Sequence, residues 1–431
     1  MIGEYMTEIT NFFKEQYISK IKNEPELFIG VELEYPIVNK RGKKTSIMVA
    51  KELFKYLSRL EGFDVVQFDG ENNPIALIHS SGDVILFEVT YNTIEFAFAK
   101  AYSIYEVESR FLEYLKLVQD YLGKFEHELQ GIGINPHWKH NDHRPVEIGR
   151  YKMLMNYLKL SNMYEGMHKY TDYAGFICGN QVQFDVSQSN FLDVINAFNK
   201  IEAVNAFLFA NSKFEMLADQ TISRDYFWEK SMHGLLEDNV GIYPSDFQSL
   251  SDFINYKKES AIFYAVRNSN YYYFRPIALK DYLNEMEIVA YSEKGEMIKL
   301  LPQLDDLNTH RSYHYQELTR RGTVEFRSIC AQPFDRTFTP IAFHLGLLTN
   351  LKEFENILEK TDFFINFGRN YKNLRKMFSK QYLSEFEFLQ IQKFAEELFN
   401  CAYSGLEKRK FGEEKFLEPL KQKLNAKYSS I

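Results

Sequence analysis

Cysteine is scarce in this chain: the 431 residues include only Cys178, Cys330 and Cys401. An odd number at such wide spacing gives neither a zinc-binding pattern nor the disulfide framework of a small secreted protein. We therefore expect a protein of a reducing compartment, the cytoplasm.

Long apolar runs and an excess of basic charge are missing as well. No stretch of about 18 apolar residues is present to cross a membrane, and residues 1–5 lack the basic region and apolar core of a secretion signal. The formal net charge is −8, which argues against nucleic acid as a partner because phosphate binding needs a basic face. We expect a soluble protein that binds neither membranes nor nucleic acid.

Neither of the common glycine-rich nucleotide loops occurs, since the chain has no Gly-x-x-x-x-Gly-Lys-Ser/Thr and no Gly-x-Gly-x-x-Gly. If ATP is used, metals and arginines must hold its phosphates. Internal repeats, low-complexity linkers and flexible hinges are also missing, which favours one compact unit over residues 1–431. Its core is expected at about 28–350, with a C-terminal helical layer at 351–431.

Among the features that are present, the clearest is an apolar segment, 28–36, that contains two acids. Side chains alternate along a strand, so Glu32 and Glu34 share one face while Val31, Leu33 and Tyr35 share the other. Two neighbouring carboxylates in an apolar segment are costly to bury unless a cation or proton compensates them, and magnesium is a suitable cation. The alternative is a half-exposed strand whose acidic face is solvated.

Further acids and amides lie in other strand-like segments. An antiparallel meander is predicted over 63–99, and it contains Glu88 and Glu95. Seven residues apart on one strand, these two would face opposite sides unless a bulge or turn intervenes near residues 91–92. Gln181 and Gln183 share a face of a later strand, which is either solvent-exposed or the floor of a site.

Glu325 and Arg327 share a face of a strand near the end of the core. A carboxylate beside a guanidinium suits a cation held next to a phosphate, although a surface ion pair on an edge strand is equally compatible. The loop at 137–143 has His137, His140 and His143, a spacing that we interpret as a polar loop rather than a zinc site.

Helical spacing of apolar residues predicts helices over 4–23, 103–128, 149–160 and 191–211, and a mainly helical region from 340 to the end. Residues 131–138 are predicted as a short strand that leads into a loop. The pattern between about 212 and 300 is too mixed to assign.

Taken in order, these segments resemble the glutamate-cysteine ligases, in particular the plant-type branch of the glutamine-synthetase-like carboxylate-amine ligases. The resemblance extends over about 28–350. It rests on eight stretches in family order: Gly30–Glu34, Phe87–Val89 with Ile94–Glu95, Gly133–Trp138, Gly149–Met153, Gln181–Asp185, Leu208–Ser212, Arg224 before Trp228, and Val324–Arg327. Residues 276–305 and the C-terminal helices have no counterpart that we can identify.

This resemblance implies an α+β fold in which a curved antiparallel sheet forms a funnel, with helices outside and magnesium at its floor. It implies metal ligands, namely Glu32, Glu34, Glu88, Glu95 and Glu325, with Gln181 or Gln183 completing the shell. Arg327 and Glu325 are the implied catalytic residues, and Arg327 would lie beside the transferred phosphoryl group. Arg224, Arg150 and Trp138 are implied in substrate binding, and His310 with Arg327 in nucleotide binding.

The implied chemistry is amide formation. ATP converts the γ-carboxylate of glutamate to an acyl phosphate, and the amine of cysteine then displaces phosphate. One alternative keeps this chemistry with another amine or a peptide as the acceptor. A second is a non-catalytic relative that binds nucleotide or amino acid, and a third is that the acids only decorate sheet edges. The expected oligomeric state is a monomer or a homodimer.

Overall fold

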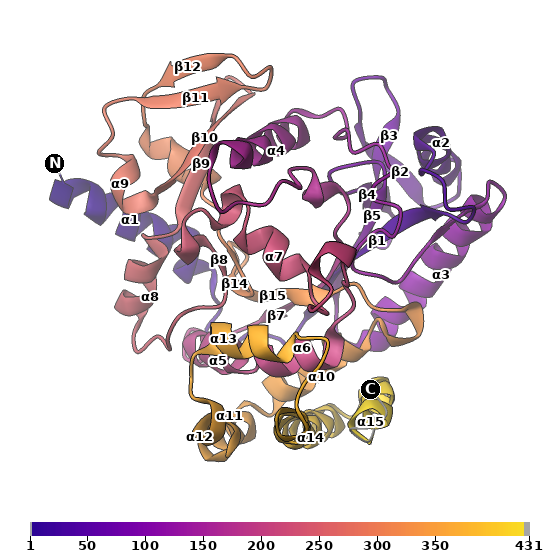
Figure 1. The fold of residues 1–431 in the computed structure, drawn as a ribbon, viewed down its shortest axis with the longest axis vertical. Helices are drawn as coiled ribbons and strands as arrows, with labels where there is room; N and C mark the ends of the chain where they lie inside the picture. Colours follow the sequence, from indigo (N-terminus) through magenta and orange to yellow (C-terminus); the bar gives the residue numbers. More distant parts are fainter. Residues whose placement is uncertain (1, 426–431) are drawn as a thin grey trace.

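The computed structural model describes residues 2–425, and an antiparallel sheet lies at its centre (Figure 1). The spatial order of its strands is β14-β15-β7-β1-β5-β4-β3-β2, with β6 paired to β1. The strands are β1 (Ile29–Asn39), β2 (Phe63–Phe68), β3 (Pro74–His79), β4 (Val84–Phe87), β5 (Thr93–Ala101), β6 (His127–Leu129), β7 (Gly179–Asp185), β14 (Gln316–Leu318) and β15 (Thr323–Cys330). Their pairings are antiparallel, so the predicted α+β class with an antiparallel sheet is confirmed.

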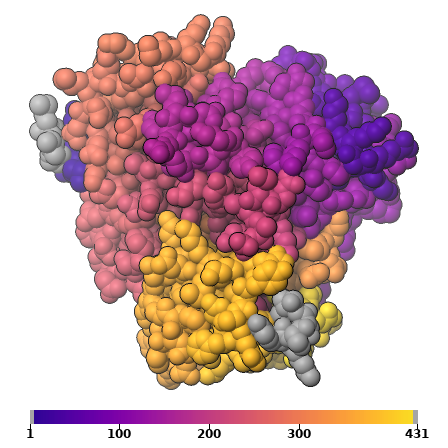
Figure 2. All heavy atoms as spheres, viewed as in Figure 1, coloured from indigo at the N-terminus to yellow at the C-terminus, as the bar shows by residue number. Residues whose placement is uncertain are grey.

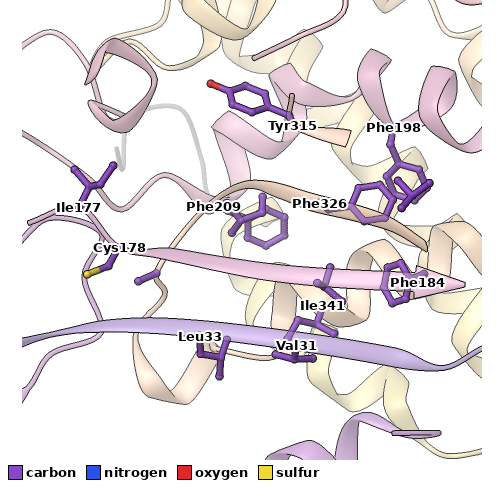
Figure 3. Packing of buried hydrophobic residues seen from close by; sticks show 14 of the residues in the cluster. Val31, Leu33, Ile177, Cys178, Phe184, Phe198, Phe209, Tyr315, Phe326 and Ile341 are labelled. Atoms are coloured by element: carbon purple, nitrogen blue, oxygen red, sulfur yellow. The ribbon is translucent and has the colours of Figure 1, made fainter. Parts of the chain in front are cut away.

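Alternation along β1 determines which face of this sheet is apolar. Val31, Leu33 and Tyr35 are each at most 1% exposed, and Figure 3 shows Val31 and Leu33 on the same side of the strand. The Tyr35 ring stacks on Phe111, with 5.7 Å between the ring centroids. Full burial of such a side chain stabilises the fold by about 1.5–3 kcal/mol. The apolar face is therefore fixed against helices, and the opposite face is left for polar side chains.

Helices cover the apolar face along its whole width. The covering helices are α2 (Ile47–Leu57), α3 (Ile104–Gly123), α5 (Phe191–Lys200), α6 (Glu202–Phe209) and α10 (Thr339–Thr349). The predicted meander over 63–99 is confirmed, because β2, β3, β4 and β5 pair in sequence order. The helix predicted over 149–160 is confirmed as α4 (Gly149–Lys159), and the leading helix as α1 (Ile2–Gln16) with a following 3-10 turn (Ile18–Lys20).

Three predicted elements differ from the structure. The helix expected over 103–128 ends at Gly123, and Glu126 has a left-handed φ of 58° before the chain enters β6. The helix expected over 191–211 divides into α5 and α6, because Ile201 (φ −96°, ψ 10°) leaves the helical conformation. The strand expected over 131–138 is reduced to one isolated bridge between Ile134 and Ile177.

The region that the sequence left unassigned forms a second, smaller antiparallel sheet, in the order β12-β11-β10-β9. It stands beside α1 at one edge of the molecule in Figure 1. Its strands are β9 (Ala261–Arg267), β10 (Asn270–Ala278), β11 (Ile288–Ser292) and β12 (Met297–Leu300); nearby lie α7 (Arg224–Glu229), α8 (Leu250–Lys257), α9 (Leu279–Tyr282) and the parallel pair of β8 (Val240–Gly241) with β13 (Tyr313–His314).

The C-terminal helices gather at one end of the molecule, where Figure 2 shows them in orange to yellow. They are α11 (Leu351–Lys360), α12 (Phe363–Phe367), α13 (Tyr371–Phe378), α14 (Glu385–Arg409) and α15 (Glu418–Leu424). One continuous apolar cluster extends from Ile9 to Leu424 and includes residues of these helices. Within residues 2–425, no helix is long and apolar enough to span a bilayer.

Two glycines allow α14 to lie directly on α10. A Cβ atom at Gly346 would collide with the carbonyl oxygen of Ala402, and one at Gly405 would collide with the carbonyl oxygen of Gly346. Backbone cannot yield as a flexible side chain can, so the close crossing of the two helices requires glycine at both positions.

We expect Gly405→Ala to lower the free energy of unfolding by about 1–3 kcal/mol, the usual cost of overpacking a dense core. The matched control is Gly123→Ala, because a Cβ at that helical position meets no atom within 4 Å. The control should be neutral or slightly stabilising, since alanine is the better helix former. Urea unfolding measures both changes, and equal stability of the two variants would contradict the close crossing.

Candidate active site

A cavity of about 370 Å³ lies on the polar face of the central sheet, and charged side chains of both signs line it. Its acidic lining consists of Glu32, Glu34, Glu88, Glu95, Asp225 and Glu325. Its basic lining consists of Arg150, Arg224, Arg311, Arg321 and Arg327. Most of the residues that the sequence indicated for a site therefore meet in one place.

The acids of the floor are brought together by strand register. Glu34 on β1 lies opposite Glu95 on β5, and Glu32 lies opposite Gln181 on β7. Directly opposed residues on neighbouring strands have side chains on the same face. The third pairing of this kind is Glu325 on β15 with Gln183 on β7, and the three pairs together form a polar patch across β5, β1, β7 and β15.

Glu88 joins this patch because the chain turns between β4 and β5. Val89 has a left-handed φ of 59°, which is rare for a β-branched residue, and β5 begins only at Thr93. The expected interruption near residues 91–92 is therefore present, and Glu88 and Glu95 line the same cavity. The hydroxyl of Tyr151 on α4 donates a hydrogen bond to Glu88 Oε2 at 2.8 Å.

Hydrogen bonds from amides hold the carboxylates of the floor apart. Glu34 accepts from the backbone N–H of Gly179 at 2.6 Å and from Gln181 Nε2 at 3.1 Å. Gln183 Nε2 donates to Glu32 at 3.1 Å and to Glu325 at 2.8 Å. Among residues 2–425, no three acidic, histidine or cysteine side chains are close enough to enclose an ion as they stand. Closing the carboxylates around an ion requires rotation of their side chains.

Crowding of the acids affects their ionisation. Burial, followed by the charge of Glu88, raises the pKa of Glu34 to about 7. Burial, followed by the charges of Glu88, Glu32 and Glu34, raises the pKa of Glu95 well above its ordinary value. The cavity floor thus has fewer negative charges than carboxyl groups at neutral pH unless a cation is present.

The five arginines that line the cavity form its second wall, and one of them, Arg327, stands on β15 within the sheet of the floor itself. Arg150 comes from α4 and Arg224 from α7, and Arg224 Nη1 donates to the carbonyl oxygen of Ile329 at 2.8 Å. Arg327 contacts Glu325 on its own strand. The Nε atoms of Arg224 and Arg327 are buried and have no hydrogen-bond partner among the described residues. Two guanidinium groups with free donors in a cavity suit a ligand with anionic oxygens.

Arg311 and Arg321 also line the cavity, and the sequence did not indicate them as site residues. Arg311 and Arg327 lie over the ring of Tyr313, at 5.7 and 6.0 Å from its centroid. Arg321 Nη2 is 3.8 Å from Glu32 Oε1. The sequence offers only one clue to these two arginines, namely that they are close to predicted site residues. Arg311 follows His310, and Arg321 precedes the strand that contains Glu325.

Two smaller hollows adjoin the cavity. One, of about 210 Å³, shares Arg311, Arg321, Glu325 and Arg327 with it and is also lined by His310 and Arg320. The other, of about 250 Å³, shares Glu32 and Arg321 and is also lined by Gln183, Phe28 and Lys100. His310 therefore lies beside the main cavity, where its Nε2 is 2.8 Å from Ser260 Oγ, and Gln183 lies at a boundary between hollows.

Trp138 does not line the cavity, so the structure gives no support to its indicated substrate role. Its ring packs against Phe176 and Phe214, with centroid distances of 5.2 and 5.0 Å. The chain leaves the sheet after Ile134 and carries Trp138 into this aromatic cluster. Trp228 on α7 is the tryptophan that reaches the cavity.

We expect the free energy of unfolding of the metal-free protein to depend on pH through the ionisation of Glu34. Its pKa of about 7, against an ordinary 4.5, means that the folded state binds more protons than the unfolded state between these values. Stability therefore falls as the pH rises from about 4.5 to about 7 and is level above it. Glu34→Gln should reduce this slope and stabilise the metal-free protein at pH 8 by about 1–3 kcal/mol.

Urea unfolding in the presence of a chelator at pH 5 and pH 8 measures this effect. The control is Glu52→Gln at an exposed position of α2, which should leave both free energies nearly unchanged. A Glu34→Gln variant that is less stable than the parent at pH 8 would contradict the interpretation.

The chain was compared with protein families, with curated proteins and with solved structures. The family model for glutamate-cysteine ligase family 2 (GCS2) matches residues 28–352. Glutamate–cysteine ligase A, chloroplastic, of Oryza sativa subsp. indica is 25% identical over 296 residues, covering 67% of this chain and 56% of the relative. The Arabidopsis thaliana chloroplastic enzyme is 25% identical over 298 residues, covering 67% of this chain and 54% of the relative.

The chain thus spans about half the length of the curated relatives it matches. Among solved structures, glutamate–cysteine ligase from Francisella tularensis in complex with AMP has a TM-score of 0.49 and 11% identity, covering 94% of this chain and 83% of that one. The family match extends over most of the chain and over the strands that form the acidic floor. The chain belongs to glutamate-cysteine ligase family 2 (GCS2).

Proposed function

We propose that this protein is an ATP- and magnesium-dependent ligase that joins the γ-carboxyl group of glutamate to an amine, with cysteine as the leading acceptor. The observation that carries the proposal is one cavity that is lined both by carboxylates of the central sheet and by five arginines. Acids suit divalent cations, and arginines suit phosphates and carboxylates. A reaction between ATP and an acidic substrate needs both.

The donor set of the floor fits magnesium, a hard cation that prefers oxygen ligands. Glu32, Glu34, Glu88, Glu95 and Glu325 would hold it, with Gln181 or Gln183 contributing an amide oxygen. The raised pKa values of Glu34 and Glu95 agree with a site that is complete only with a cation. Bound magnesium would neutralise charge that develops on the phosphoryl oxygens.

Different arginines would bind the different anionic groups of the substrates, namely the phosphoryl group of ATP and the carboxylates of glutamate. Arg327 lies between the main cavity and the hollow that contains His310, a position suited to the γ-phosphoryl group of ATP. Arg224 and Arg150 lie on α7 and α4, farther along the wall, where they would bind the carboxylates of glutamate. The buried Nε atoms of Arg224 and Arg327 have no hydrogen-bond partner among the described residues, which fits guanidinium groups whose hydrogen bonding is complete only with a ligand.

The reaction proceeds in two transfers. A γ-carboxylate oxygen of glutamate attacks the γ-phosphorus of ATP, the bond to the bridging oxygen breaks, and ADP leaves. The amine of the acceptor, having lost a proton from its ammonium form, attacks the acyl carbon and releases inorganic phosphate. Arg327 stabilises the charge on the phosphoryl oxygens in the first transfer, and no covalent bond to the enzyme forms.

The alternatives concern the acceptor and catalysis itself. Another amine or a peptide would use the same floor and the same activation step. A non-catalytic relative would bind nucleotide or amino acid without turnover. We favour catalysis because the acids, the amides and Arg327 lie together around the cavity. The cytoplasm remains the proposed location.

Hydroxylamine should intercept the activated glutamate whichever acceptor the enzyme uses. With ATP, magnesium and glutamate, we expect γ-glutamyl hydroxamate together with equimolar ADP. Glu32→Gln and Arg327→Ala should each lower this rate by about 10²–10³-fold, because each removes charge stabilisation of the transition state. Glu52→Gln, on the exposed face of α2, is the control and should match the parent. Absence of hydroxamate with the parent enzyme would support the non-catalytic alternative.

The acceptor is identified by ADP release with glutamate and a panel of amino acids, amines and short peptides. We expect cysteine to give the highest kcat/KM. Hydroxamate formation without any stimulation by cysteine would instead favour the alternative of a different acceptor.

A further inference from the structure

Arg375 is a buried arginine of the C-terminal helical layer, on α13, and its side chain is 3% exposed. All five of its N–H groups are used. Nε and Nη2 donate to the carboxylate of Asp225 at 2.6 and 3.1 Å, and Nη2 also donates to the carbonyl oxygen of Ser328 at 3.1 Å. Nη1 donates to the side chain and to the carbonyl oxygen of Glu202. A guanidinium with every donor satisfied has a single defined position.

The partners of Arg375 lie next to residues of the proposed active site. Asp225 follows Arg224 on α7, and Ser328 follows Arg327 on β15. Asp225 and Ser328 themselves line the cavity. One guanidinium therefore connects the two elements that position Arg224 and Arg327, from the side opposite the cavity.

Arg375 supports the N-terminal end of α7, a helix of six residues whose N-cap residue Ser223 makes no side-chain capping bond. Farther along α7, Phe227 is fully buried in an aromatic cluster, so the first turn with Arg224 is the part that the contact with Asp225 fixes. Tyr315 strengthens the junction: its hydroxyl donates to Asp225 at 2.7 Å, and Arg375 lies over its ring at 4.6 Å. The bidentate Arg375–Asp225 pair is of the strong, geometrically specific kind.

We propose that Arg375 is a positioning residue that sets the spacing of Arg224 and Arg327 across the cavity. Residue 375 lies outside the segment 28–352 that matches the family, so the C-terminal layer takes part in shaping the site. The inference rests on the proposed function for its kinetic consequence. Misplacement of catalytic groups by about 1 Å is enough to lower a rate by about 10²-fold.

The test compares Arg375→Lys with the parent in the hydroxamate assay. Lysine keeps the charge but loses the planar fork, so kcat/KM for glutamate should fall at least tenfold, through both a lower kcat and a higher KM. Tyr315→Phe removes one hydrogen bond to Asp225 and should give a smaller loss in the same direction. Asn373→Ala is the control at an exposed position of α13, and it should behave as the parent.

A merely structural role would lower the thermal midpoint and leave kcat and KM per folded molecule unchanged, and that result would overturn the proposal. Crystal structures of the parent and of Arg375→Lys give a second readout that does not need activity. We expect a changed separation of Arg224 and Arg327 in the variant, and an unchanged separation would also overturn the proposal. A parent without glutamate-dependent turnover would refute the proposed function, while the two structures would still decide the role of Arg375.

Discussion

Mutual repulsion of carboxylates on one face of the central sheet is the constraint on which this structure depends. Strand alternation gives β1 an apolar face against helices and an acidic face toward a cavity. Acids gathered in this way are costly to desolvate. The amides of Gln181 and Gln183 offset part of the cost, and the arginine wall offsets more. Burial, followed by the charge of Glu88, still raises the pKa of Glu34, so these contacts offset the cost only in part.

The acidic floor and the arginine wall of the cavity differ in the elements of the fold that hold their side chains in place. Except for Glu88, the acids of the floor stand on β1, β5 and β15, each of which is paired with a strand on both sides. The arginines stand on α4, on the short helix α7, on β15 and on irregular segments around residues 311 and 321. The short helix α7 and the irregular segments are also held by contacts from elsewhere, and Arg375 provides one from the far end of the chain. The floor is thus fixed by the sheet, and the wall, apart from Arg327 on β15, by tertiary contacts.

This difference explains what the sequence could predict. Glu32 with Glu34 and Glu325 with Arg327 follow from a period of two, and the meander follows from its turns. Glu88 depends on the left-handed conformation of Val89, which no pattern announces. Arg311 and Arg321 are placed by tertiary structure alone, as is Arg375, which meets Asp225 across 150 residues. Trp138 packs in an aromatic cluster outside the cavity, a contact that its place in the sequence does not reveal.

The same difference bears on the proposed reaction. Activation of a carboxylate makes similar demands in every reaction of this type, namely a place for the cation and a place for the phosphoryl group. The paired strands of the sheet hold the acids of the floor in one fixed arrangement, which suits a site for a cation. In the proposed reaction the arginines bind the phosphoryl group and the carboxylates of glutamate, so they belong to the activation side as well. Because Arg375 lies outside the segment that matches the family and contacts both Asp225 beside Arg224 and Ser328 beside Arg327, the C-terminal layer bears on the glutamate and phosphoryl groups of the proposed reaction together.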